Sequence, residues 1–180
     1  MTELSLNLLD IAQNSIKADA TLIVLSVKTA GQAMTLTVED NGHGMTAEQA
    51  EKVTDPFFTT RTTRKVGLGI PFLKMGAELT GGWFGISSEV GKGTVIKAVY
   101  NLDHINVIPL GDMASTMVTL VSGCPEIHFV YEYESNGKGF CLDTREVKRI
   151  LEGVPVNDPQ VLAFIRGFIN ENMQMLENET

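Results

Sequence analysis

Hydrophobic residues recur every three or four positions at the start of the chain. Between residues 4 and 17 they are Leu4, Leu8, Leu9, Ile11, Ala12 and Ile16. This is the spacing of one face of an α-helix, so the pattern predicts a helix over 4–17. Two runs of β-branched or alternating residues follow, Thr21 to Val27 and Met34 to Glu39, with Ala30-Gly31-Gln32 between them. They predict two strands joined by a turn.

The pattern between residues 40 and 102 predicts two helices and two more strands. Thr46 and Gln49 fit the glutamine form of a capping box and predict a short helix that ends near Val53. Residues 57–66 are polar, basic and rich in threonine without a period, which is typical of a loop. A helix is expected over 70–79, and strands over 83–88 and 94–102. This α/β arrangement ends near residue 102.

The remaining residues, 103–180, predict a second and smaller unit. After a linker over 103–112, strands are expected at 116–121 and 127–134, and Asn136-Gly137 is a strong signal for a hairpin that leads into 139–142. Helices are expected after the potential caps Asp143 and Asp158. The last helix has an apolar stripe that favours packing on its own sheet over a cofactor site: Leu162, Ile165, Phe168, Ile169 and Leu176. We therefore expect one domain over 1–102 and a small α+β domain of unknown role over 103–180.

Composition is typical of a soluble globular protein, with 43% hydrophobic and 20% charged residues. A formal charge of −8 argues against a non-specific nucleic-acid binder, which needs a basic face to replace counterions. No stretch approaches the roughly 20 apolar residues of a membrane span, and Met1-Thr2-Glu3 does not resemble the start of a signal peptide. We therefore expect a cytoplasmic protein that binds neither nucleic acid nor membrane.

Two polar residues of the first helix are candidates for chemistry on a phosphate. Asp10 and Asn14 are four positions apart, so their side chains project from the same face. A carboxylate can polarise a water molecule, and an amide oxygen can coordinate Mg²⁺, which prefers oxygen ligands. On spacing alone, a solvated helix face explains the pair better.

Three glycine-containing segments complete the set of candidates. In Asp40-Asn41-Gly42-His43-Gly44, an aspartate at the end of a strand can accept the amino group of adenine, and glycines allow close approach of a flat base. Taken alone, the segment is better explained as a plain turn, and we interpret His43 as an exposed loop residue.

The other two glycine segments are weaker when each is considered alone. Gly67-Leu68-Gly69 opens a helix, whose free N–H groups favour phosphate. The cations before it, Arg61, Arg64 and Lys65, could fold over the phosphates or form a solvated basic loop. Gly91-Lys92-Gly93-Thr94 is a tight turn that places a hydroxyl at the start of a strand.

Taken in order, these segments resemble the GHKL superfamily, which includes sensor histidine kinases, gyrase, MutL and the ninety-kilodalton heat-shock chaperones. LLDIAQNSIKADATLI (residues 8–23) is similar to the N box, especially in its MutL and gyrase form, and VEDNGHGM (38–45) to the G1 box. DPFFTTR (55–61) and GLGIPFLKMGAELTGG (67–82) resemble the F and G2 boxes of histidine kinases, and SSEVGKGTVI (87–96) the segment that ends the domain. Four boxes in the right order are a specific signal.

The resemblance implies a fold and a set of roles. The fold would be α/β (α+β), a two-layer sandwich with a mixed sheet and helices on one face. ATP and Mg²⁺ would bind between the first helix and a lid formed by residues 59–65. Residue by residue, Asn14 would bind Mg²⁺, Asp40 would bind adenine with help from Thr94, Gly42 and Gly44 would shape the base pocket, and Gly67 and Gly69 would meet phosphate.

Three departures from the family pattern limit the functional inference. The catalytic glutamate of the MutL and gyrase form corresponds to Asp10, which is shorter by one methylene group. The first glycine of the kinase G2 box corresponds to Lys65. Nothing precedes the N box, so we expect the dimerising helices and phosphoacceptor histidine of a sensor kinase to be missing.

Three functional hypotheses remain open from the sequence. The first is a slow ATPase, or a kinase acting in trans on a protein partner, with Asp10 as the base. The second is a non-catalytic module of the anti-sigma type that changes partners when ATP binds. The third, a redox regulator that uses Cys124 and Cys141, rests on residue identity alone; reduced, half-buried thiols are the default, although the two could face each other across a hairpin. A homodimer is possible in each case.

Overall fold

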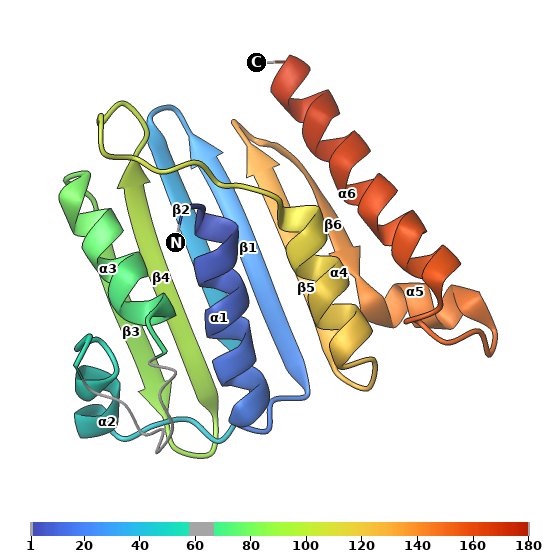
Figure 1. The fold of residues 1–180 in the computed structure, drawn as a ribbon, viewed down its shortest axis with the longest axis horizontal. Helices are drawn as coiled ribbons and strands as arrows, with labels where there is room; N and C mark the ends of the chain where they lie inside the picture. Colours follow the sequence, from blue (N-terminus) through green and yellow to red (C-terminus); the bar gives the residue numbers. More distant parts are fainter. Residues whose placement is uncertain (1, 58–66, 180) are drawn as a thin grey trace.

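The computed structural model describes residues 2–57 and 67–179. Its framework is one six-stranded sheet in the order β3-β4-β2-β1-β5-β6 (Figure 1). The strands are β1 (Leu22–Ala30), β2 (Ala33–Asp40), β3 (Trp83–Glu89), β4 (Gly93–Asn101), β5 (His128–Ser135) and β6 (Lys138–Asp143). All neighbouring strands are antiparallel except β1 and β5, which are parallel, so the sheet is mixed.

Helices cover one face of this sheet (Figure 1). They are α1 (Leu4–Lys17), α2 (Ala47–Lys52), α3 (Gly69–Leu79), α4 (Met113–Gly123), α5 (Thr144–Leu151) and α6 (Pro159–Asn178). Alternate residues of β1, Ile23, Leu25 and Val27, are fully buried beneath them. The two-layer sandwich with a mixed sheet is confirmed.

Local signals in the sequence correspond to elements in the structure. Thr46 and Gln49 form both hydrogen bonds of the capping box of α2. Asn136 and Gly137 both have positive φ angles in the turn between β5 and β6, as a two-residue hairpin requires. Asp143 and Asp158 accept backbone N–H groups at the starts of α5 and α6.

The expectation of a strand over 116–121 is wrong, because these residues belong to helix α4. Thr116, Val118, Thr119 and Val121 are β-branched and favour a strand by propensity. The buried positions of the segment nevertheless follow a helical period: Met113, Ala114, Met117, Leu120 and Val121. Packing of this stripe against α1 and α6 outweighs local propensity.

Residues 103–179 extend the same sheet and the same hydrophobic core. β5 pairs with β1 from Leu22↔His128 to Thr29↔Ser135, and one buried cluster includes side chains from both halves of the chain. The expected boundary at residue 102 therefore falls within one continuous sheet.

The segment after β4 also completes the first helix. Glu3, at the N-cap of α1, makes no side-chain capping bond. Instead, the N–H groups of Leu4 and Ser5 donate to the carbonyl oxygens of Pro109 and Leu110, at 3.0 and 2.7 Å. The first N–H groups of a helix have no partner within it, so the segment at Pro109 and Leu110 satisfies two of them.

Candidate functional site

A cavity of about 690 Å³ lies between α1, the ends of β2 and β4, and the loops around α2 and α3. Five of the residues expected at a nucleotide site line it: Asn14, Asp40, Gly44, Gly67 and Thr94. Most of the other lining side chains are apolar: Ile11, Ala18, Met45, Val53, Ile70, Val90 and Ile96. An apolar cavity with a few converging polar groups is the usual form of a small-molecule site.

Asp40 is held in a fixed orientation at the end of β2. The Ser15 hydroxyl donates to its Oδ2 at 2.6 Å, and the Gly42 N–H donates to its Oδ1 at 2.9 Å. Each carboxylate oxygen has a second lone pair, so the group can still accept a hydrogen bond from a ligand. Ser15 is 4% exposed and lines the cavity; no pattern in the sequence predicts its role.

The two glycines of the G1 box are required by neighbouring backbone. A Cβ on Gly42 would lie 2.6 Å from the carbonyl oxygen of Ala18. A Cβ on Gly44, whose φ is +69°, would lie 2.0 Å from that of Glu89. The loop is therefore closely packed between the end of α1 and the turn before β4, which positions Asp40 and His43. His43 is exposed, as expected, and lines the cavity.

Thr94 belongs to a small network of hydroxyl and backbone groups. Its hydroxyl lies 2.8 Å from that of Ser88 on β3. Ser88 Oγ also accepts the Met45 N–H at 2.8 Å and donates to the Gly93 carbonyl oxygen at 3.0 Å. Thr94 stands directly opposite Asp40 in the β2–β4 pairing, so both groups face the same end of the cavity.

Asp10 makes a contact that its spacing did not predict. Its Oδ2 accepts the Gly69 N–H at 2.8 Å, so the carboxylate caps the start of α3. A Cβ on Gly69 would lie 2.6 Å from this oxygen, which explains a glycine at this position. Four residues expected at the site are not among those that line the cavity: Asp10, Gly42, Leu68 and Gly69.

The residues present are compatible with Mg²⁺ held mainly by phosphate. Asn14 contributes an amide to the cavity wall. Within residues 2–57 and 67–179, no three His, Cys, Asp or Glu side chains gather as a potential metal site. Mg²⁺ commonly uses one or two protein oxygens together with substrate phosphates and water, so a single amide fits this mode. Arg61, Arg64 and Lys65 lie outside the described residues.

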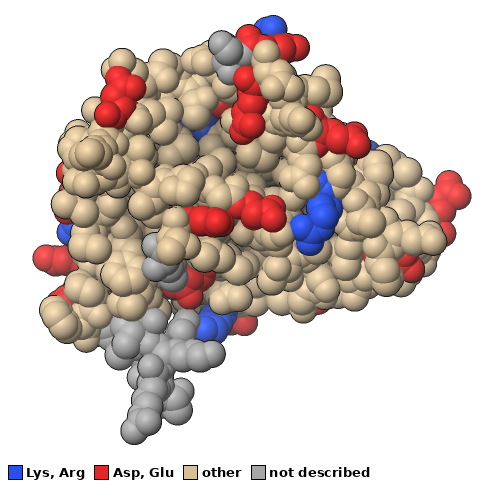
Figure 2. All heavy atoms as spheres, turned by 45° about the horizontal axis from the view of Figure 1, so that its top comes forward, with Lys and Arg blue, Asp and Glu red and all other residues tan. Residues whose placement is uncertain are grey.

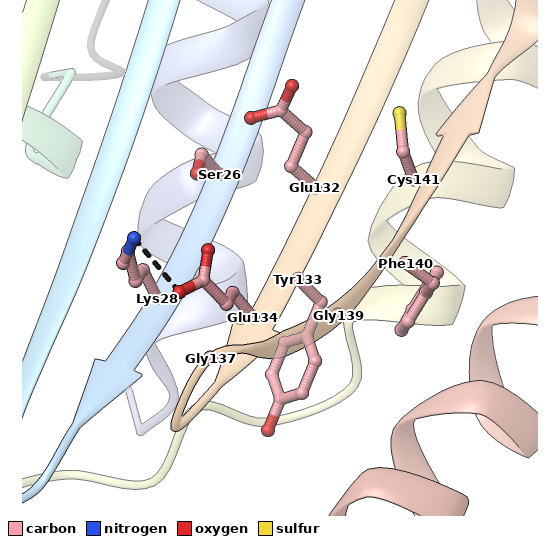
Figure 3. A pocket seen from close by; sticks show the side chains of 9 residues that line it. All are labelled: Ser26, Lys28, Glu132, Tyr133, Glu134, Gly137, Gly139, Phe140 and Cys141. Carbon is pink, nitrogen blue, oxygen red and sulfur yellow. Dashed lines mark ion pairs between the residues drawn. The ribbon is translucent and has the colours of Figure 1, made fainter.

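A second hollow, on the uncovered face of the sheet, contains Cys141 (Figure 3). Burial raises the pKa of the Cys141 thiol, and the neighbouring carboxylates Glu132 and Asp143 raise it further. Burial and Glu126 likewise raise the pKa of Cys124. Both cysteines are free, and Cys124 lies at the end of α4 rather than on the β5–β6 hairpin. Raised pKa values disfavour the thiolate that redox chemistry needs.

The surface reflects the acidic composition of the chain. On the face shown in Figure 2, acidic side chains are scattered and basic ones form small separate groups. In the part of the chain that the structure describes, no helix is both long and apolar enough to cross a bilayer.

Comparison with known proteins agrees with this geometry. The family described as histidine kinase-, DNA gyrase B-, and HSP90-like ATPase matches residues 2–104, more than half of the chain. The match includes every residue that lines the cavity. The fold and the site thus define an ATP-binding domain of the histidine kinase-like class, and the chain belongs to this family.

The alignments with individual relatives cover only part of each protein. The chain is 46% identical over 61 residues to the sensor kinase CckA of Brucella abortus (33% of this chain, 6% of the relative). It is 32% identical over 97 residues to sporulation kinase C of Bacillus subtilis (52% and 22%). The chain thus matches less than a quarter of the length of either relative.

A structural similarity extends beyond the matched domain. The ATPase domain of Aquifex aeolicus MutL, solved with ADP, superposes with a TM-score of 0.50 at 13% identity. The superposition covers 84% of this chain and 70% of that one. It therefore supports the fold over most of the chain, including residues after 104.

Proposed function

We propose that the chain binds ATP together with Mg²⁺ in the cavity beneath α1. The observation that carries the proposal is the Asp40 carboxylate, which Ser15 and Gly42 hold at the end of a cavity lined by both apolar and polar side chains. A half-buried acceptor in fixed orientation suits the exocyclic amino group of adenine. The family match to residues 2–104 supports this assignment.

Phosphates would extend from the base site toward the start of α3. The helix N-terminus favours negative charge there, and Gly67 lines the intervening wall. In this proposal Leu68 and Gly69 contribute backbone N–H groups, Arg61, Arg64 and Lys65 contribute positive charge, and the Asn14 amide oxygen coordinates the metal. Bound Mg²⁺ would bridge phosphate oxygens and offset their charge.

For activity, we propose weak ATP hydrolysis, or phosphotransfer in trans to a protein partner, with Asp10 as the base. The Asp10 carboxylate would have to leave the Gly69 N–H, because a base must reach the attacking water or hydroxyl directly. Opening of this contact would also free the Gly69 N–H for phosphate. A partner protein that favours the open state would then accelerate turnover.

One observation favours a second candidate, a nucleotide-controlled binding module without catalysis. With Asp10 bonded to Gly69, the carboxylate joins α1 to α3 and is not among the groups lining the cavity. ATP binding would then change the position of α3, and so the surface offered to a partner.

Purified protein with Mg-ATP distinguishes the two candidates. Calorimetry measures binding, phosphate release measures hydrolysis, and label from γ-labelled ATP reports transfer to co-purifying proteins. Turnover or transfer that is lost in Asp10→Asn supports the enzyme. Tight binding with turnover equal to buffer supports the binding module. No detectable binding of ATP would contradict both.

A further inference from the structure

Ser88 makes three polar contacts around the base end of the cavity, although it does not line the cavity itself. It accepts the Met45 N–H, donates to the Gly93 carbonyl oxygen, and lies 2.8 Å from the Thr94 hydroxyl. These contacts join β3, the loop before α2 and the start of β4.

The proton positions in this network follow from counting. Ser88 carries one hydroxyl proton, and the Gly93 carbonyl oxygen can only accept. If that proton goes to Gly93, the Thr94 hydroxyl must donate its own proton to Ser88 for the 2.8 Å contact to be a hydrogen bond. All three contacts are then satisfied, and Thr94, which lines the cavity, can offer a ligand only the lone pairs of its Oγ1.

The end of the cavity therefore presents two acceptors. Asp40 and Thr94 are directly opposite partners on β2 and β4, where cross-strand side chains are about 5 Å apart at Cβ. An exocyclic amino group has two N–H bonds and suits two acceptors. An oxo group in the same place would meet two acceptors and no donor.

We propose that Ser88 is a positioning residue that fixes Thr94 as an acceptor and thereby sets the preference of the site for a 6-amino over a 6-oxo purine nucleotide. The proposal rests on the proposed ATP binding. Without Ser88, the Thr94 hydroxyl can rotate and donate to an oxo group, so discrimination falls even where the shape of the cavity is kept.

The experiment compares dissociation constants for ATP and for inosine triphosphate, its 6-oxo counterpart, by calorimetry with Mg²⁺. The full chain is expected to prefer ATP. The ratio of interest is the dissociation constant for inosine triphosphate divided by that for ATP. In Ser88→Ala this ratio should fall about two- to tenfold, which corresponds to the loss of one hydrogen bond. Ser88→Thr keeps a hydroxyl and should retain the ratio.

Two further variants separate positioning from a merely structural effect. Ser87→Ala changes the exposed neighbour on the same strand and should leave the ratio unchanged. Thr94→Val removes the acceptor, so Ser88→Ala in that background should produce no additional change in the ratio. Loosening of the loop alone would weaken both nucleotides equally and leave the ratio unaltered.

The outcomes distinguish this inference from the function on which it rests. A lower ratio in Ser88→Ala, kept in Ser88→Thr and absent in the Thr94→Val background, supports the inference. An unchanged ratio in Ser88→Ala, with ATP still bound by the parent chain, overturns it and leaves ATP binding standing. Equal affinity of the parent chain for both nucleotides also overturns the inference but leaves the proposed function standing. Failure of the parent chain to bind ATP overturns the inference and contradicts the proposed function as well.

Discussion

Asp10 connects two elements through a single hydrogen bond. Its carboxylate accepts the first N–H of α3, as a capping side chain does, but it comes from α1 rather than from the residue before the helix. Leu68, at the N-cap of α3, makes no side-chain capping bond. The residue proposed as a base is thus also a structural contact, and experiments on it must separate the two roles.

Replacement of Asp10 by alanine should destabilise the protein by about 1 kcal/mol, the usual cost of losing a helix cap. Asp10→Asn should cost less, because the amide oxygen can still accept the Gly69 N–H. Chemical denaturation of both variants measures the difference, with Gln13→Ala, an exposed change on the same helix, as control. Equal stability of Asp10→Ala and the parent chain would contradict the capping role.

Asn14 is the proposed protein ligand of Mg²⁺, so its replacement should reduce the effect of Mg²⁺ on ATP affinity. We expect that Mg²⁺ strengthens ATP binding in the parent chain and that Asn14→Ala loses most of this increase, because the site then lacks its protein oxygen. Calorimetry with Mg²⁺ and with chelator gives both constants, and Gln13→Ala again serves as control. A Mg²⁺ dependence in Asn14→Ala equal to that of the parent chain would exclude the assignment.

At the scale of elements, α1 depends on residues from the far half of the chain. Its first two N–H groups bond to Pro109 and Leu110, and β1 beneath it pairs with β5 along eight residues. Since α1 carries Asp10, Asn14 and Ser15, residues 103–179 support the site without lining it.

A chain that ends at residue 102 should therefore fold poorly. It would expose the β1 edge, which is prone to non-native pairing, and the apolar surface that α4 and β5 cover. We expect aggregation, or thermal unfolding well below that of the full chain, in size-exclusion chromatography and circular dichroism. A monomeric fragment that melts cooperatively and binds Mg-ATP like the full chain would show that 1–102 is an independent domain.

The sequence predicted those elements whose signals are local. The capping box at Thr46, the Asn136-Gly137 turn and the periodicity of 4–17 each depend on neighbours in the chain. Helix α4 was mistaken for a strand because its β-branched residues favour one, and the cap formed by Asp112 with the Ser115 N–H was overlooked. The parallel pairing of β1 with β5 joins segments about a hundred residues apart and has no local signature.

For the candidate site, too, the sequence predicted the residues that belong to motifs and not those that act through distant contacts. Asn14, Asp40, Gly44, Gly67 and Thr94 were identified because family boxes contain them, and they do line one cavity. Ser15 and Ser88 were missed because a single hydroxyl carries no pattern. Their importance depends on distances to Asp40 and Thr94, which only a folded chain defines.

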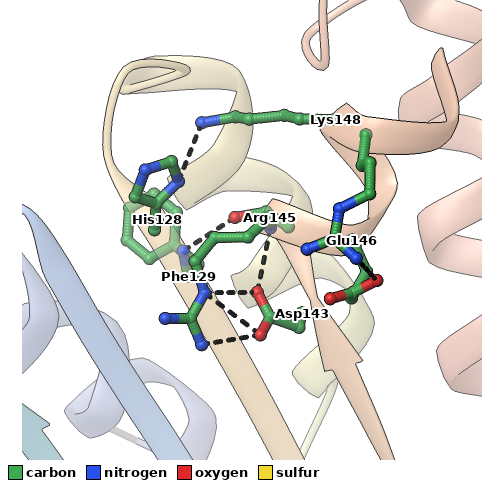
Figure 4. Close-up of polar contacts among 8 residues, drawn as sticks. His128, Phe129, Asp143, Arg145, Glu146 and Lys148 are labelled. Atoms are coloured by element: carbon green, nitrogen blue, oxygen red, sulfur yellow. Dashed lines mark hydrogen bonds and ion pairs between the residues drawn. The ribbon is translucent and has the colours of Figure 1, made fainter. Parts of the chain in front are cut away.

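At the scale of the whole molecule, acid should weaken the fold in two stages. Burial lowers the pKa of His128 below 6.5, and Lys148 and Arg145 lower it further, while Asp143 opposes them (Figure 4). The His128 imidazole therefore binds a proton more readily in the unfolded chain than in the folded one. The free energy of unfolding thus falls as the pH drops below about 6.5. Hydrogen bonds from Ser115 and Arg145 lower the pKa values of Asp112 and Asp143 below 3.8, so their contribution is lost only in stronger acid.

The His128 stage can be measured by itself. Thermal unfolding of the parent chain should occur at a lower temperature at pH 5.5 than at pH 7, and His128→Gln should reduce this difference because the amide does not titrate. Equal differences in the parent and in His128→Gln would assign the loss of stability to other groups.

The central claim is that Asp40 binds the adenine of ATP, and one titration tests it most directly. Calorimetry with Mg-ATP should show binding by the full chain. Asp40→Asn should weaken this binding by roughly tenfold or more. The adenine amino group then loses a charged hydrogen-bond acceptor, and the Asn side chain can turn its own N–H donor toward it. Glu39→Gln, the same chemical change on the exposed neighbour, should bind like the parent chain. Unchanged affinity of Asp40→Asn, at a thermal stability equal to that of the parent, would contradict the account.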